Sequence, residues 1–332
     1  MTPQRSKLAN GHQRFYWGPI DVMIYAEAEQ ETNTNIQLVQ EAHESAWERF
    51  QEILPELVNE LSILKLPIDD QDNTCLTGPI AKKMWQACQP YYPTFITPMA
   101  AVAGAVADDL LAHYQIPGIH KAWVNNGGDI ALHLSGHQQI PIGICADSYR
   151  ANETMQQLGS FSLDGQLTVS TQDPVRGIAT SGWQGRSFSM GIADSVTVLA
   201  HNAASADAAA TIIANAVNVD DARIQRRPAC DMKDDSDLGD HLVTVHVPKL
   251  EHQVIEQALE NGFAKAQTLK NQGIIWGAIL NCQDQVRSVF SAQSIEVNQW
   301  MNQRFMMSAG ARIHYQVGGL AADKISAWDG QK

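Results

Sequence analysis

The sequence predicts an α+β fold in which antiparallel strand pairs are separated by helices. Three observations predict it: short runs in which apolar residues alternate, longer segments with apolar residues at helical spacing, and strands that come in pairs instead of strict βαβ alternation. At 332 residues the chain is long enough for one enlarged domain or for two lobes. We expect a flexible N-terminus over 1–17, an α+β domain over 18–300 and a C-terminal arm or tail over 301–332.

The first part of the domain is predicted to contain one strand and two helices. Residues 18–29 form the strand, favoured by β-branched and aromatic residues after a Gly-Pro turn. Residues 35–64 form a helix that Pro55 should kink or divide. Residues 96–114 form a second helix with Thr97 as its N-cap. Apart from one apolar stripe this helix consists largely of Ala and Gly, which suits close approach to a sheet or a ligand.

The second part is predicted to consist of hairpins, two further helices and a polar loop. The predicted elements are a hairpin over 120–146 with its turn at "SGHQQ", a hairpin turning at Asp164-Gly165, strands near 177–190 and 193–200, an alanine-rich helix over 205–217, a polar loop, a strand at "HLVTVHV", a helix over 249–269 and a closing hairpin in "GIIWGAILNCQDQVRSVFSAQ".

Composition excludes several classes of function. The chain has 23 basic and 36 acidic residues, a net charge of −13, which disfavours binding to nucleic acid. No apolar run reaches the roughly 18 residues of a membrane span, and the first residues lack the apolar core of a secretory signal. The five cysteines include no C-x-x-C pair, so we expect free thiols and no structural zinc. We therefore expect a cytoplasmic protein with a small-molecule ligand, and a homodimer is plausible because sheet edges can pair.

Asp207 and Thr211 are the candidate metal ligands. They stand at i and i+4 on the alanine-rich helix, so both oxygens lie on one face with only alanines between them. Hard cations such as Mg²⁺ prefer oxygen ligands and accept few protein ligands when phosphates supply the rest. The helix start could also hold a pyrophosphate. The alternative is an acid placed favourably against the helix dipole, with a threonine bonded back to a helix carbonyl.

Two glycine-containing segments are candidate ligand-binding elements. In "NNGGDI" two glycines interrupt a strand-like run, which indicates either close approach to a ligand or a β-bulge. In "ATSG" two hydroxyls and a glycine stand at a strand end, where either a ligand or an ordinary turn would account for them. The candidate cofactor-binding residues are Asn126, Gly127, Gly128, Asp129, Thr180, Ser181 and Gly182.

Taken in order, "NNGGDI", "ATSG" and "SVTVLAHNAASADAAAT" resemble the ApbE family, flavin transferases that move FMN from FAD onto a protein threonine. The resemblance covers roughly 95–215. It implies an ApbE-like α+β fold, a T-fold variant, with Mg²⁺ and FAD or FMN as the cofactors. It also implies that Asp207 and Thr211 occupy the metal position, and that residues 126–129 lie near the ligand.

The chain departs from the transferase pattern at two places. The segment "VAGAVADD" has Gly104 where the transferases carry a lysine, although Asp109 is kept. The segment "SFSMGIADSVTV" lacks the histidine and the D-P-x-T-G loop of the transferases. Removing a proton from a threonine nucleophile commonly requires a positioned partner, so these losses argue against FMN transfer. The sequence is therefore more similar to an uncharacterised cytoplasmic branch of the superfamily than to the transferases.

Three further residues are candidate catalytic groups. His201 stands just before the alanine-rich helix, where it is either a base or a helix-entry histidine bonded to the backbone. Asp109 is the acid kept from the family helix. Asp237 belongs to "DSDLGD", which is either a solvated acidic loop or a lid that carries charge over the site.

The sequence thus favours an enzyme related to the flavin transferases. We expect it to bind a flavin-like or phosphorylated heteroaromatic ligand with Mg²⁺ and to catalyse a reaction other than flavinylation. Two alternatives stay open: a true FAD:protein FMN transferase with a rebuilt base, and a non-catalytic ligand-binding or assembly module.

Overall fold

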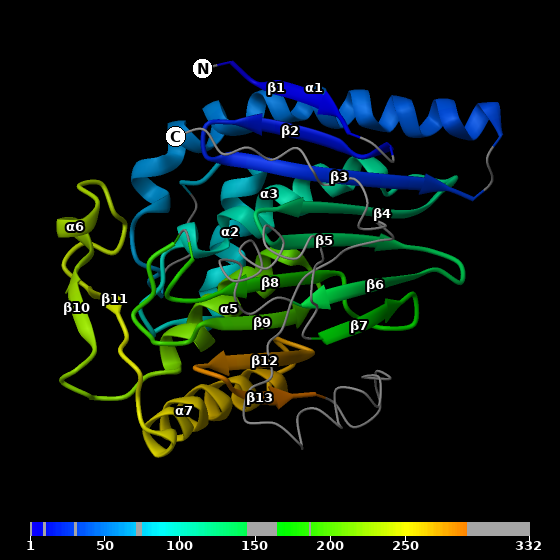
Figure 1. Ribbon diagram of the computed structural model, residues 1–332. Helices are drawn as coiled ribbons and strands as arrows, with labels where there is room; N and C mark the ends of the chain where they lie inside the picture. Colours follow the sequence, from blue (N-terminus) through cyan, green and yellow to red (C-terminus); the bar gives the residue numbers. More distant parts are fainter. Residues whose placement is uncertain are drawn as a thin grey trace.

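A nine-stranded antiparallel sheet forms the centre of the molecule (Figure 1). The computed structural model describes residues 2–8, 11–29, 32–70, 75–144, 165–185 and 187–290. In spatial order the strands are β1 (Gln4–Lys7), β2 (Gln13–Trp17), β3 (Ile20–Ala28), β4 (Ile119–Asn126), β5 (Asp129–Leu134), β8 (Gly177–Ser181), β9 (Ser195–Ala200), β12 (Gly277–Cys282) and β13 (Gln285–Val289). Every neighbouring pair is antiparallel. The predicted α+β class with antiparallel strands is confirmed.

Helices cover one face of this sheet and share its larger apolar core (Figure 1). The α-helices on this face are α1 (Asn33–Leu64), α2 (Pro79–Cys88), α3 (Val102–Leu111), α5 (Ala203–Ala216) and α7 (His252–Asn271). Short 3-10 turns follow or precede them: η2 (Gln89–Tyr91), η3 (Pro98–Ala101) and η4 (Ala112–Tyr114). No helix in the described ranges combines the length and the apolar composition needed to cross a bilayer.

A second apolar core lies on the opposite face of the sheet. There β6 (Gln139–Ile144) and β7 (Gly165–Ser170) pair as a separate two-stranded sheet. The pleat of β4 shows how one strand serves both cores, because Ala122 and Val124 belong to the helix-side cluster and Trp123 to the other. Strands buried on both faces explain the nearly continuous apolar runs in this part of the sequence.

A small flap extends from the side of the molecule (Figure 1). It comprises β10 (Gln225–Pro228), α6 (Ala229–Met232) and β11 (Leu242–His246), and its two strands pair only with each other within the described residues. We call residues 225–246 the flap. It contains the "DSDLGD" loop that was expected to be either solvated or a lid.

Several elements differ from the sequence-based expectations. Within the N-terminal segment that was expected to be flexible, residues 4–7 and 13–17 form the first two strands of the sheet. Pro55 does not divide α1, whose apolar face is buried on both sides of it. The expected helix over 96–114 is a short α-helix between two 3-10 turns, and the Thr97 side chain makes no cap hydrogen bond. The predicted turn at Asp164 and the C-terminal arm over 301–332 lie outside the described residues.

The turn of the first predicted hairpin is also in a different place. The expected turn was "SGHQQ", but β4 and β5 turn at Gly127 and Gly128, with Asn126 opposite Asp129. Both glycines have positive φ, +68° and +118°, which a two-residue hairpin turn requires. The two glycines therefore form a hairpin turn and not the bulge that was one of their two alternatives, and β6 pairs with β7 instead of β5.

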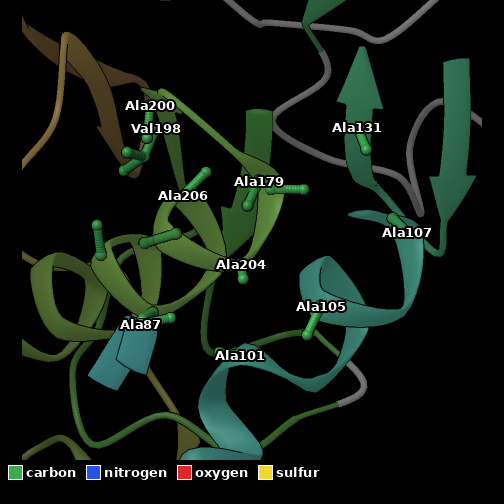
Figure 2. Packing of buried hydrophobic residues seen from close by; sticks show 14 of the residues in the cluster. Ala87, Ala101, Ala105, Ala107, Ala131, Ala179, Val198, Ala200, Ala204 and Ala206 are labelled. Carbon is green, nitrogen blue, oxygen red and sulfur yellow. The ribbon is translucent and has the colours of Figure 1, made fainter. Parts of the chain in front are cut away.

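Small residues bring α3, α5 and the centre of the sheet close together. Figure 2 shows alanines from α3, α5, β5 and β8 facing one another in this layer, among them Ala105, Ala131, Ala179 and Ala204. A Cβ atom added at Gly177 would lie 1.9 Å from the backbone carbon of Asn202. No larger side chain fits at that point unless α5 moves away from β8.

Candidate functional site

The carboxylate of Asp207 is the centre of the candidate site. It lies on the second turn of α5, and its Oδ2 accepts a hydrogen bond from the backbone N–H of Gly104 in α3 at 3.0 Å. The N–H of Ala103 binds the same carboxylate. Burial raises the pKa of Asp207 well above its ordinary value, and the negative charge of Asp129 raises it further. The charge of Asp129 therefore acts on the Asp207 carboxylate.

Asp129 is held at the site by the neighbouring strand. It directly follows the Gly127-Gly128 turn, and its Oδ1 accepts the backbone N–H of Thr180 in β8 at 3.2 Å. The hydroxyl of Thr180 in turn shares a hydrogen bond of 2.9 Å with that of Thr197. Asp207 and Asp129 thus each have one carboxylate oxygen bound to a backbone N–H group, which fixes how the carboxylates are oriented.

Asn126 fixes the position of the glycine turn relative to α3. Its side chain is buried, and its Nδ2 donates to the carbonyl of Ala103 at 3.1 Å. The N–H of Gly128 donates to the side chain of Asn125 at 2.8 Å. A Cβ added at Gly128 would meet nothing within 4 Å, so there is open space next to the turn at this glycine.

Two partly buried residues near Asp207 and Thr180 have side-chain hydroxyls that make no hydrogen bond within the described part of the chain. Thr211 lies one helical turn beyond Asp207, and Ser181 ends β8. Thr211 does not bond back to a helix carbonyl, which was the alternative to a ligand role. At Gly182, by contrast, packing explains why the residue is a glycine, because a Cβ there would lie 2.1 Å from the carbonyl oxygen of Asp194.

The start of α5 does not offer the free N–H groups that a pyrophosphate would need, so that expectation was wrong. Asp108 in α3 accepts the N–H groups of Ala203 and Ala204, each at 3.0 Å. The side chain of Asn202 accepts the N–H of Ser205 at 2.7 Å. Because carboxylate and amide oxygens already bind these donors, no anion can bind there without displacing them.

The three candidate catalytic residues have hydrogen-bond partners other than Asp207. Asp109 lies on the other side of α3, where its Oδ2 accepts from Nε of Arg49 at 2.7 Å. His201 is exposed at the start of α5, 3.4 Å from the hydroxyl of Ser205. Asp237 lies in the flap and accepts a hydrogen bond of 2.5 Å from the hydroxyl of Thr97.

The residues that sequence reasoning missed are Asp108 and Cys88. Asp108 is buried, and it stands four residues after Gly104, so helical spacing places it on the face that meets α5. That spacing was the available signal. Cys88 is fully buried next to Asp207, and its thiol donates to the carbonyl of Thr97 at 3.3 Å. Burial raises its pKa, so the thiol stays protonated; no sequence signal marks it.

A metal ion at this site would need ligands besides carboxylates. Among the residues that the structure describes, no three His, Cys, Asp or Glu side chains form a metal-binding group. Asp207 and Asp129 offer oxygen ligands, and Thr211 adds a hydroxyl on the same helix face as Asp207. This donor set fits a hard cation that takes its remaining ligands from water or from a bound molecule.

An open hollow of about 400 Å³ lies elsewhere, beyond the C-terminal end of α5. It is lined by Asn218, Val219, Asp220, Arg226 and Asn261. Its polar groups bind one another, since Arg226 donates to the side chain of Asn218 at 2.6 Å and Asn261 donates to the Asn218 carbonyl at 2.9 Å. These contacts close the end of α5, and the hollow contains none of the predicted site residues.

Comparison with known proteins adds sequence relatives. Residues 5–288 match the family model described as "AbpE bacteria". The UPF0280 protein MK0206 of Methanopyrus kandleri is 31% identical over 215 residues, 65% of this chain and 78% of that protein. A UPF0280 protein of Methanothermobacter thermautotrophicus is 40% identical over 126 residues, 37% of this chain and 43% of that protein. The chain therefore matches less than half the length of the second relative.

Two solved structures are also similar. The flavin transferase ApbE from Vibrio cholerae is 13% identical with a TM-score of 0.37, over 88% of this chain and 98% of that chain. The ApbE protein from Thermotoga maritima is 11% identical with a TM-score of 0.36, over 84% of this chain and 93% of that chain. Both TM-scores are low, so the family assignment rests on the sequence matches.

Proposed function

Because the chain belongs to the AbpE bacteria family, we propose that it is an ApbE-like enzyme that binds a flavin-like or phosphorylated heteroaromatic ligand together with a divalent cation, Mg²⁺ being the first candidate. The observation that carries the proposal is the convergence of Asp207 and Asp129. They come from α5 and from the start of β5, 78 positions apart in the sequence, and the charge of Asp129 acts on Asp207.

A cation between the two carboxylates would remove their repulsion. As the site stands, the charge of Asp129 disfavours ionisation of Asp207, and only backbone N–H groups oppose that effect. A divalent ion favours the ionised form of both groups. Asp207 and Asp129 would hold the ion. The hydroxyl of Thr211, which makes no hydrogen bond within the described residues, would be a further oxygen ligand. The cation would neutralise phosphate oxygens of the ligand.

Phosphate binding at this site should depend on the cation. The N–H groups at the start of α5 bind Asp108, and those of Ala103 and Gly104 in α3 bind Asp207. Neither helix start is therefore available as an anion site of the usual kind. This favours a mode in which ligand phosphates reach the protein through the metal ion.

Flavin transfer to a threonine is not the reaction that we propose. The transferases carry a lysine where this chain has Gly104, and a Cβ at Gly104 would lie 2.3 Å from the carbonyl oxygen of Ala203. A side chain at this position would collide with the backbone of α5, so no base reaches the site from there. We propose that the bound ligand undergoes a different reaction, oriented by the carboxylates and by the glycine turn.

Isothermal titration calorimetry with FAD, FMN and ADP tests this proposal. We expect binding with Mg²⁺ present, little binding in EDTA, and loss of the Mg²⁺ effect in Asp207→Asn. If neither flavin nor ADP binds in the presence of Mg²⁺, the ligand assignment is wrong. Release of AMP and covalent flavin on a threonine peptide would instead establish the transferase alternative. Mg²⁺-independent binding that Asp207→Asn leaves unchanged would favour the non-catalytic module.

A further inference from the structure

Helices α3 and α5 cap each other through two carboxylates. Asp108 of α3 accepts the first two N–H groups of α5, and Asp207 of α5 accepts N–H groups at the start of α3. A carboxylate at a helix start satisfies otherwise unpaired N–H groups and interacts favourably with the helix dipole. The two interactions are reciprocal, so sliding or rotating either helix would break both.

The contact between the helices is too close to allow adjustment. A Cβ at Gly104 would lie 2.3 Å from the carbonyl oxygen of Ala203 and 2.8 Å from the N atom of Ala204. Asp108 stands one turn after Gly104 and binds the N–H groups of the same two alanines. The backbone contact and the carboxylate together fix the position of α5 along α3.

We propose that Asp108 is a positioning residue for the cation site. By holding the first turn of α5 on α3, it sets where Asp207, one turn further along, stands relative to Asp129. This inference rests on the proposed function, since it concerns the affinity of the same site. Asp108 does not itself touch the ion. Its own surroundings are the α5 backbone, Lys83 at 4.0 Å, the nearby charge of His201, and Asp207, whose pKa the charge of Asp108 raises.

The adjacent Asp109 provides a matched control. It has the same chemistry and lies one residue further along α3, with 17% of its side chain exposed against 7% for Asp108. Its partner is Arg49 of α1, and in the part of the chain that the structure describes it accepts no hydrogen bond from α5. A change at Asp109 therefore perturbs α3 and its stability but leaves the N–H donors of α5 bound.

The test is a titration of wild type, Asp108→Asn, Asp109→Asn and Asp207→Asn with Mn²⁺ alone, followed by electron paramagnetic resonance of the free ion. An asparagine cannot accept both N–H groups, because its amide nitrogen faces one of them. We expect Asp108→Asn to weaken Mn²⁺ binding about tenfold, within the range known for residues that orient metal ligands. We expect Asp109→Asn to bind as the wild type does and Asp207→Asn to lose binding.

Two further measurements distinguish a change in the position of Asp207 from a loss of folding and from a loss of charge. Circular dichroism identifies the fraction of each variant that is folded, and Asp108→Ser, which keeps one short acceptor, replaces Asp108→Asn if that variant does not fold. The titration is repeated with Asp108→Glu, which keeps the negative charge but displaces the carboxylate by one methylene group, so that a loss caused only by the missing charge would not occur in this variant. We expect the loss to persist.

The outcomes distinguish this inference from the function on which it rests. Wild-type affinity in Asp108→Asn, an equal loss in Asp109→Asn, or wild-type affinity in Asp108→Glu would overturn the positioning role while the Asp207 site stands. Absence of Mn²⁺ binding in the wild type, or binding that Asp207→Asn leaves unchanged, would overturn both.

Discussion

Helix α3 makes two different contacts on its two sides. Towards α5 it presents Gly104, small residues and Asp108, and backbone groups meet almost directly. Towards α1 it presents Asp109, which forms an ion pair with Arg49, and the following turn places Tyr114 against His43. The first contact leaves no room for movement next to the candidate site. The second consists of long side chains and contributes stability. Substitutions on the two sides should therefore have different effects.

The largest effect is expected at the α5 side, from Gly104→Ala. The new methyl group would meet the Ala203 carbonyl, which cannot move without moving α5. We expect the free energy of unfolding to fall by about 3 kcal/mol, at the upper end of typical overpacking costs. Urea denaturation followed by circular dichroism measures it.

Gly262→Ala is the control for this substitution. Gly262 is also a helical glycine, but a Cβ there would meet the Cγ2 methyl of Val217 at 2.3 Å, and a side chain can adjust more readily than a carbonyl. We expect a loss of less than half that of Gly104→Ala. Equal losses would mean that the α3–α5 contact is not exceptionally rigid.

On the α1 side, His43 should make stability depend on pH. Burial lowers its pKa from 6.5 to about 4, and its Nδ1 lies 2.8 Å from the hydroxyl of Tyr114. The neutral ring is stabilising above the unfolded-state pKa of 6.5, and this stability is lost as the pH falls from 6.5 towards 4. The loss is at most about 3 kcal/mol.

His43→Gln measures this contribution, because glutamine does not titrate and can still accept the hydrogen bond of Tyr114. Urea unfolding at pH 7 and at pH 4.5 should show a smaller difference in stability for this variant than for the wild type. His201→Gln, a change at an exposed histidine, is the control. An unchanged pH dependence in His43→Gln would show that the ring is not held neutral.

The ion pair of Arg49 and Asp109 should give a smaller effect that is confined to stability. Arg49 also binds Glu56 at 2.7 Å, and only 15% of its side chain is exposed. We expect Asp109→Asn to lower the free energy of unfolding by about 2 kcal/mol, less than for a fully buried pair. A double-mutant cycle with Arg49→Met isolates the coupling. Coupling near zero would contradict the assignment of stability to this side of α3.

The smallest effect is expected at the flap, from Asp237→Asn. This change weakens the hydrogen bond from Thr97, and Lys65 still binds Asp235 at 3.2 Å. We expect a loss below about 1 kcal/mol, with faster amide hydrogen exchange in residues 225–246. Asp234→Asn, at an exposed position of the same loop, should leave exchange unchanged. Equal exchange in both variants would show that Thr97 does not hold the flap.

The elements that sequence analysis predicted well are those set by local pattern. The strand at 20–28, the helix at 33–64 and the closing hairpin at 277–289 follow from apolar spacing within each segment. The turn at Gly127 and Gly128 was missed because alternation continues on both sides of it. Both faces of β4 and β5 are buried, and the pattern therefore does not show where the chain reverses.

The site was predictable only where a motif marks it. The resemblance to the ApbE motifs implies a shared site for Asp207 and residues 126–129, and in the structure the charge of Asp129 acts on Asp207. The binding role of these residues stays a prediction. No motif shows which of Asp108 and Asp109 faces α5. Adjacent residues on a helix point in different directions around its axis, and the sequence does not show which helix packs on each side. Asp237 meets Thr97 across 140 positions, a contact that no local pattern encodes.

The central claim is that Asp207 and Asp129 together bind one divalent cation. Mn²⁺ titration of the wild type, Asp207→Asn and Asp129→Asn by isothermal calorimetry tests it most directly, with circular dichroism to show that each variant is folded. We expect one bound ion per chain in the wild type and no binding in either variant. Binding that survives in both folded variants, or is absent from the wild type, would contradict it.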